Sequence, residues 1–160
     1  MSNIAIFPGC FDPWTYAHHS ILQRATKLFD KVIIAVLDTS ETKSIRFDTA
    51  TRLELIQAAC AGLETVEVEV FSGLVTSFCV KKSVFNVIRG VRRSQDFQYE
   101  WEMYHHNQVL CKDIEWVLLP CRKEFVGVSS SLVKEIYHYG GDISHWVPET
   151  VIKALAKHGA

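Results

Sequence analysis

Hydrophobic positions along this chain alternate between two patterns. Five short runs are rich in β-branched and other apolar residues, which predicts strands at 4–7, 32–36, 66–70, 84–88 and 115–119. The run at 32–36 is apolar throughout, as expected of a buried parallel strand. Elsewhere apolar and aromatic residues recur every three or four positions, which predicts helices. The helical stripes are Ile21, Leu22, Ala25, Leu28 and Phe29; Leu53, Ile56, Ala59, Cys60 and Leu63; and Phe97, Trp101, Tyr104 and Gln108.

Three further helices complete the pattern. Residues 74–81 form a short helical candidate, Ser131 is a suitable N-cap for a helix to Tyr139, and Pro148 suits the first turn of a last helix. The resulting order, β-α-β-α-β-α-β-α-β-α-α, implies right-handed crossovers. The sequence therefore predicts an α/β fold, with residues 1–160 forming a single domain: an open parallel five-stranded sheet with helices on both faces.

In such sheets ligands bind beyond the carboxyl ends of the strands, at a topological switch point. The segments that follow the first, second, fourth and fifth runs are the candidates. They are residues 8–18, 38–46, 89–96 and 120–131, and most of them are rich in polar residues and glycine.

Composition restricts the partners. The 160 residues carry 17 Lys and Arg against 18 Asp and Glu, so the chain has no global field for a nucleic acid backbone, and a local site must hold any anionic ligand. No stretch approaches the roughly 18–20 apolar residues of a membrane span, and the first residues lack the pattern of a signal peptide. Five cysteines without a C-x-x-C pair favour free, reduced thiols over zinc binding. We expect a cytoplasmic protein with no nucleic acid or membrane partner.

The junction after the first run combines glycine, proline and histidine. Residues 8–13 read P-G-C-F-D-P. His18 comes after this loop and precedes Ile21 by three residues and Leu22 by four. His18 therefore lies on the buried face of the helix, one turn nearer its start. The amides and positive dipole end of a helix start suit a phosphate. A lone histidine here is more often a satisfied core residue, but the loop before it favours a ligand-binding role.

Two other segments offer phosphate-binding groups. Arg89 ends an apolar run, where a solvated charge is a poor explanation, and Arg92 and Arg93 follow it. Guanidinium groups bind phosphate bidentately. Residues 129–131 are three consecutive serines, of which one must cap the helix and the others can form a second phosphate cradle.

These motifs carry a family resemblance. P-G-C-F-D-P followed by T-Y-A-H resembles the signature of the nucleotidyltransferase superfamily of the (H/T)-x-G-H type, with Thr15 and His18 matching and Ala17 in place of glycine. The segments IRGVRRSQDFQYE and SSSLVKEIYHYGGDISHWVPETV extend this likeness, collinearly over nearly the whole chain, to the phosphopantetheine adenylyltransferase family. They separate it from cytidylyltransferases and from nicotinate or nicotinamide mononucleotide adenylyltransferases.

The resemblance implies a Rossmann-like nucleotidyltransferase fold, assembled as a homohexamer. It implies an enzyme that moves AMP from ATP to 4′-phosphopantetheine, giving dephospho-coenzyme A and pyrophosphate, with His18 stabilising charge at the α-phosphate. The implied ATP-binding residues are Cys10, Phe11, His18, Gly90, Val91, Arg92, Glu100, Phe125, Val126, Gly127, Val128, Ser129, Ser130 and Ser131. The implied acceptor-binding residues are Cys10, Lys43, Val75 and Arg89.

This chemistry needs no protein nucleophile, because an acceptor phosphate oxygen is already one. In-line displacement can proceed by positioning two anions and stabilising the α-phosphate. The sequence has no compact carboxylate cluster for a metal of its own, so Mg²⁺ is expected to arrive with ATP.

Three alternatives stay open from the sequence. The acceptor could be another phosphorylated small molecule. The chain could be a nucleotide-binding module that has lost catalysis, since Ala17, Cys10 and the loop of Lys43 depart from the family pattern. Redox chemistry at Cys10, near a predicted helix start, is a remote third.

Overall fold

The computed structural model describes residues 3–39 and 45–157 of the chain. Its element order confirms the predicted alternation and adds one 3₁₀ turn, η1. The strands are β1 (Ile4–Gly9), β2 (Lys31–Leu37), β3 (Val66–Phe71), β4 (Asn86–Val91) and β5 (Glu115–Pro120). The helices are α1 (Tyr16–Ala25), α2 (Thr49–Ala59), α3 (Val75–Lys82), α4 (Ser94–Leu110), η1 (Lys123–Phe125), α5 (Ser130–His138) and α6 (Glu149–Lys157).

The strands form one parallel sheet in the order β3-β2-β1-β4-β5, which confirms the predicted fold class. β1 lies in the centre, where Phe7 pairs with Ile34 of β2 and Ile6 pairs with Val87 of β4. The chain winds outward in one direction through β2 and β3 and then returns to the other side of β1. The switch point therefore lies between the carboxyl ends of β1 and β4.

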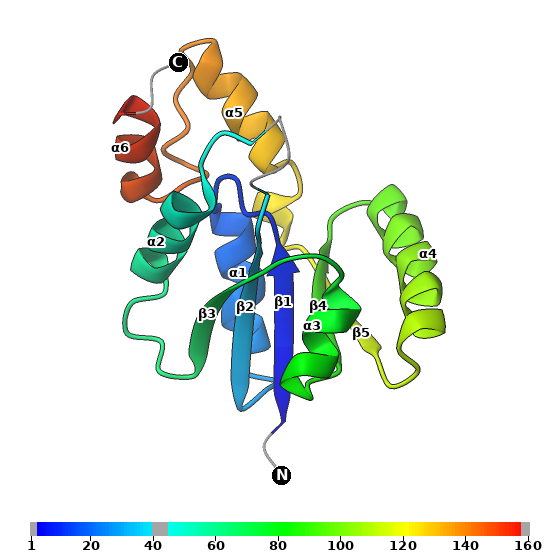
Figure 1. Ribbon diagram of the computed structural model, residues 1–160. Coiled ribbons are helices and arrows are strands. Elements are labelled where there is room, and N and C mark those ends of the chain that lie inside the picture. Colours follow the sequence, from blue (N-terminus) through cyan, green and yellow to red (C-terminus); the bar gives the residue numbers. More distant parts are fainter. Residues whose placement is uncertain (1–2, 40–44, 158–160) are drawn as a thin grey trace.

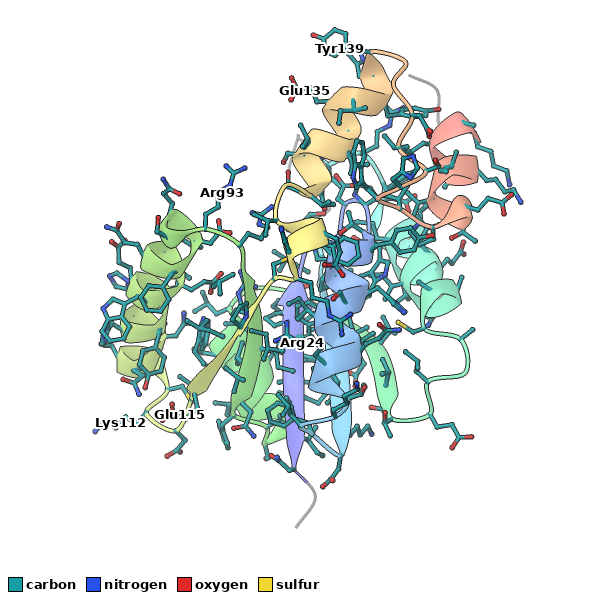
Figure 2. All side chains as sticks on the ribbon, turned by 180° about the vertical axis from the view of Figure 1, so that it is seen from behind. Arg24, Arg93, Lys112, Glu115, Glu135 and Tyr139 are labelled. Carbon is teal, nitrogen blue, oxygen red and sulfur yellow. The ribbon has the colours of Figure 1, made fainter. Side chains whose placement is uncertain are left out.

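Two apolar layers cover the sheet, and a third cluster lies beyond its carboxyl edge. Leu22 of α1 and Ile56 of α2 pack on one face, whereas Phe78 of α3 packs on the other. Figure 1 shows α3 in front of the strands, and Figure 2, seen from behind, shows α1 on the other face of the sheet. The third cluster joins α5 and α6 to Phe47 and Leu55, so these helices lie above the ends of the strands (Figure 1).

Two predicted boundaries are wrong in ways that affect the site. β4 begins at Asn86, because Ser83 takes a left-handed backbone and the Val84 amide still donates to Cys79 of α3. The strand then continues to Val91, paired with β5, so Arg89 lies on the strand and not after it. The N-cap of α5 is Ser129 instead of Ser131, since the Ser129 hydroxyl accepts the Leu132 amide at 3.1 Å.

Candidate active site

A cavity of about 580 Å³ lies at the switch point, a volume within the range of small-molecule sites. It is lined by parts of all four segments that the topology identified. The lining residues are Phe7, Pro8, Gly9, Cys10, Phe11, Asp12, Ala17, His18, Ile21, Ile45, Arg89, Gly90, Arg92, Cys121, Val128, Ser129, Ser130, Ser131 and Lys134.

The loop after β1 is shaped by aromatic packing. Phe11 has a φ of 51°, in the left-handed region that bulky residues rarely adopt. Its ring lies edge-on to Phe7 and to His18, with centroid distances of 5.3 and 5.2 Å. A Cβ on Gly9 would stand 2.9 Å from that ring, so any other residue here would force the Phe11 ring to shift. The strained turn is therefore held in place by its own packing.

Hydrogen bonding fixes the proton of the His18 ring. The Thr15 backbone amide donates to His18 Nδ1 at 3.1 Å, and Thr15 Oγ1 lies 3.0 Å from the same nitrogen. Since an amide can only donate, Nδ1 is the acceptor and the neutral ring carries its hydrogen on Nε2. Burial, and then the charges of Arg92 and Arg89, lower the pKa of His18 to about 4. At neutral pH His18 is an uncharged donor at the cavity wall.

The start of α1 offers fewer amides than expected. The Tyr16 amide donates to Trp146 O at 2.8 Å, and the His18 amide donates weakly to Thr15 Oγ1 at 3.4 Å. Two of the first amides of the helix are therefore used within the protein. The prediction of a free set of amides at this helix start is not met.

Arg89 reaches the cavity from β4 and is held on two sides. Its Nε donates to both oxygens of Glu100 at 2.9 Å, and its Nη2 donates to Glu100 Oε1 at 2.8 Å. Its Nη1 donates to Pro8 O at 2.8 Å. Trp116 Nε1 donates to the other oxygen of Glu100 at 2.9 Å.

Arg92 has a similar but more exposed arrangement. Its Nε and backbone amide donate to Asp96 Oδ2 at 3.1 and 3.0 Å, and its Nη1 donates to Val128 O at 3.0 Å. The third arginine, Arg93, is exposed and points away from the molecule (Figure 2). Arg89 and Arg92, but not Arg93, line the cavity.

The three serines have separate tasks. Ser129 caps α5, and the Ser130 hydroxyl donates to Pro13 O at 2.8 Å, which ties α5 to the loop after β1. Among the residues that the structure describes, the Ser131 hydroxyl has no protein partner. Its hydroxyl and the open amides at this helix start are the groups left to receive a phosphate.

Lys134 and Asp12 are site residues that sequence reasoning missed. Lys134 Nζ lies 2.9 Å from Asp12 Oδ2, whose carboxylate also accepts the Arg46 and Phe47 amides at 2.8 and 2.9 Å. Asp12 is only 4% exposed. Lys134 follows Ser130 by four residues, so helical periodicity alone places it on the serine face of α5.

Arg52 was also missed, although it organises the rim of the site. It is fully buried, and its five N–H groups donate to five oxygens. The acceptors are Phe47 O, Cys10 O, Leu37 O, Thr39 Oγ1 and Thr49 Oγ1. It precedes Ile56 by four residues, so its position in the buried stripe of α2 was the available signal.

Several predicted binding residues lie away from the cavity lining. They are Val75 at the start of α3, Val91 at the end of β4, Glu100 on α4, Phe125 in η1, and Val126 and Gly127 before α5. Lys43 lies outside the described residues. The binding roles of these seven residues stay predictions, as do those of the predicted residues that line the cavity. Gly90 does line the cavity, and a Cβ there would stand 3.2 Å from the side chain of Ile21 of α1, so packing against the helix also favours a small residue.

All five cysteines are free thiols. Cys10 and Cys121 line the cavity, whereas burial raises the pKa of Cys60 to about 11 and that of Cys79 to about 12. Across residues 3–39 and 45–157, no three His, Cys, Asp or Glu side chains are grouped as a metal site. Within the same ranges, no helix is both long and apolar enough to cross a membrane.

Comparisons with known proteins point in one direction. Residues 6–136 match the family described as cytidylyltransferase-like. The chain is 41% identical to the phosphopantetheine adenylyltransferase of Nautilia profundicola, over 97% of this chain and 100% of that protein. It is 39% identical to the phosphopantetheine adenylyltransferase of Thermodesulfovibrio yellowstonii, over 97% and 96% of the two chains.

A solved structure supports the fold alone. Plasmodium falciparum nicotinic acid mononucleotide adenylyltransferase complexed with NaAD superposes with a TM-score of 0.76. The match covers 99% of this chain and 96% of that one, at 15% identity.

Proposed function

The chain belongs to the phosphopantetheine adenylyltransferase family, and on that premise we propose how its cavity transfers AMP from ATP to 4′-phosphopantetheine in coenzyme A biosynthesis. The products are dephospho-coenzyme A and pyrophosphate. The observation that carries the proposal is the neutral His18 donor beside Arg89 and Arg92 in one cavity.

The acceptor phosphate attacks the α-phosphorus in line, without a covalent enzyme intermediate. Arg89 binds the acceptor phosphate, with Lys43, Cys10 and Val75 as further acceptor contacts. His18 Nε2–H donates to the oxygen on which charge grows at the α-phosphate. A neutral donor fits this task, because it needs no proton from solvent and its hydrogen is already directed by Thr15.

ATP occupies the side of the cavity formed by α5. Arg92, the serines of residues 129–131 and Lys134 surround its phosphates, and the backbone at Cys10 and Phe11 contacts the nucleotide. Gly90, Val91, Glu100 and residues 125–128 complete the proposed ATP-binding set.

Mg²⁺ accompanies ATP in this proposal and neutralises phosphate charge. Asp12, the carboxylate among the described lining residues, already accepts two amides and Lys134. The residues present therefore fit a metal held by phosphate oxygens and water, as Mg²⁺ commonly is.

The proposed assembly is a homohexamer, and the proposed location is the cytoplasm. The assembly rests on the family, and the exposed rings of Phe97, Tyr99 and Trp101 on α4 are compatible with a subunit contact. Light scattering on the purified protein tests it.

The test of function is pyrophosphate release with Mg²⁺, ATP and 4′-phosphopantetheine, run beside pantetheine without its phosphate. We expect release only with the phosphorylated acceptor, together with dephospho-coenzyme A. Release with a different phosphorylated acceptor alone would change the substrate. Binding of both ligands without release would identify a module that has lost catalysis.

A further inference from the structure

Glu100 is buried against the site without lining the cavity. Its side chain is 7% exposed, and it faces β4 and β5 from α4. Arg89 Nε donates to both of its oxygens and Arg89 Nη2 donates to Oε1. Trp116 Nε1 donates to Oε2. Both carboxylate oxygens are thus engaged by the protein.

The same contacts determine how Arg89 meets a ligand. A guanidinium has five N–H groups. Glu100 engages one on Nε and one on Nη2, and Pro8 O engages one on Nη1. With respect to the described residues, one N–H on Nη1 and one on Nη2 remain, on a side chain that lines the cavity. Two adjacent nitrogens with a free hydrogen each suit a phosphate.

Holding Arg89 in advance has an energetic consequence. An arginine side chain has several rotatable bonds, and a ligand that binds a mobile arginine must otherwise overcome the entropic cost of ordering it. Clamping from Glu100 on one side and Pro8 on the other removes most of that cost before binding. The carboxylate of Glu100 also offsets the positive charge of Arg89, and this second effect weakens the attraction of Arg89 for a phosphate.

We propose that Glu100 is a positioning residue for the acceptor phosphate, which it serves through Arg89. Trp116 supports Glu100 through its Nε1 donor to Oε2. The proposal rests on the proposed function, and it gives Glu100 a role in addition to the ATP contact that the family resemblance implies.

Three roles for Glu100 give three different results when its charge is removed. A positioning role predicts weaker recognition of the acceptor phosphate. A role limited to offsetting charge predicts stronger recognition, since Arg89 would gain net positive field. An ATP contact predicts weaker ATP binding with acceptor binding unchanged.

The experiment is calorimetric titration of the full chain as wild type, Glu100→Gln and Trp116→Phe. Each is titrated separately with 4′-phosphopantetheine, pantetheine and Mg-ATP. The measured quantity is the Kd for pantetheine divided by the Kd for 4′-phosphopantetheine, which isolates the phosphate. We expect Glu100→Gln to lower this ratio by about tenfold, the scale of a charge-assisted hydrogen bond, and to leave the Kd for pantetheine near wild type. The Mg-ATP titration measures the proposed ATP contact of Glu100 separately.

Trp116→Phe keeps an aromatic ring and removes one donor from Glu100. It should lower the ratio by a smaller factor than Glu100→Gln does. If circular dichroism shows that Glu100→Gln is unfolded, Trp116→Phe alone tests the positioning role. An unchanged or higher ratio in the folded variants overturns the positioning role, as does a loss confined to ATP. A ratio near one in the wild type would mean that the acceptor phosphate is not recognised. That result would contradict the proposed function itself, and with it this inference.

Discussion

Lys134 Nζ lies 2.9 Å from Asp12 Oδ2, a contact that joins α5 to the loop after β1. Glu100 holds Arg89 and Asp96 holds Arg92 in the same way. Among the described residues that line the cavity, every lysine and arginine is thus oriented by a carboxylate before any ligand arrives. The site is preorganised for anions while its net field stays moderate.

Lys134→Met should weaken ATP binding by about tenfold or more, because a charge-assisted phosphate contact contributes about 1.5–3 kcal/mol. It also leaves Asp12 as an uncompensated negative charge near the phosphates. Calorimetry with Mg-ATP measures the effect. Lys134→Arg is the matched control and should stay closer to wild type. Wild-type affinity in Lys134→Met would remove this lysine from the ATP site.

His18→Ala should reduce the single-turnover rate by about 10²–10³-fold, as expected for loss of one donor to developing charge. ATP affinity should change little, since the contact strengthens only in the transition state. His19→Ala is the control, because that neighbouring residue does not line the cavity. A His18→Ala rate equal to that of His19→Ala would exclude His18 from the mechanism.

His18 should also make stability depend on pH. Its pKa is lowered to about 4 in the fold from an ordinary 6.5, so the unfolded chain binds more protons between those values. Stability from this group is therefore complete above pH 6.5 and is lost as pH falls toward 4, by at most about 1.4 kcal/mol per unit. Urea unfolding at pH 7 and pH 5 measures the free energy of unfolding of wild type and of His18→Ala. Subtracting the two proteins at each pH removes the contribution of the other histidines. A difference that does not change with pH would contradict the lowered pKa.

Arg89→Ala should lower the free energy of unfolding by about 3 kcal/mol, the low end of the cost of breaking a buried ion pair, because it leaves Glu100 buried without its partner. Arg89 is partly exposed, with a side-chain exposure of 29%, which moderates the cost. The double variant Arg89→Ala/Glu100→Ala should recover part of that loss. Chemical denaturation of both variants tests the pair, and a double variant less stable than Arg89→Ala would argue against a buried charge penalty.

Arg52→Met should cost at least about 3 kcal/mol, since several buried oxygens lose their donor at about 1–3 kcal/mol each. Arg93→Met, on the exposed start of α4, is the control and should stay within about 0.5 kcal/mol of wild type. Urea unfolding compares them. Equal midpoints would show that water replaces the Arg52 contacts without loss.

The parallel five-stranded sheet and the edge that carries the cavity followed from the sequence, because strands that alternate with helices imply crossover connections. The strand order came from the structure. The end of β4 did not follow from the sequence either, since Arg89 and Gly90 continue the strand only through pairing with β5. The Ser131 cap was misplaced for a similar reason. Any of three adjacent serines satisfies a local capping rule, and the bond from Ser130 to Pro13 O, far away in sequence, helps to decide among them.

The site residues likewise divide into those that local sequence patterns identify and those that depend on tertiary contacts. His18 was found because its helical face and its loop both point to a ligand. Lys134 and Arg52 occupy equally informative helical positions, but their roles depend on Asp12 O atoms and on backbone carbonyls brought in by tertiary folding. Local periodicity marks such residues as unusual, and only the packed structure names their partners.

The contact between Ser130 and Pro13 spans 117 residues of sequence, and the Tyr16 amide finds its acceptor still later, at Trp146. During synthesis, β1 and the loop after it leave the ribosome long before either partner exists. The phosphate-binding wall of the cavity can therefore close only after Ser130 and Trp146 have been synthesised. A nascent chain that has not yet reached these two residues holds an unfinished pocket, and the competence to bind ATP follows their synthesis.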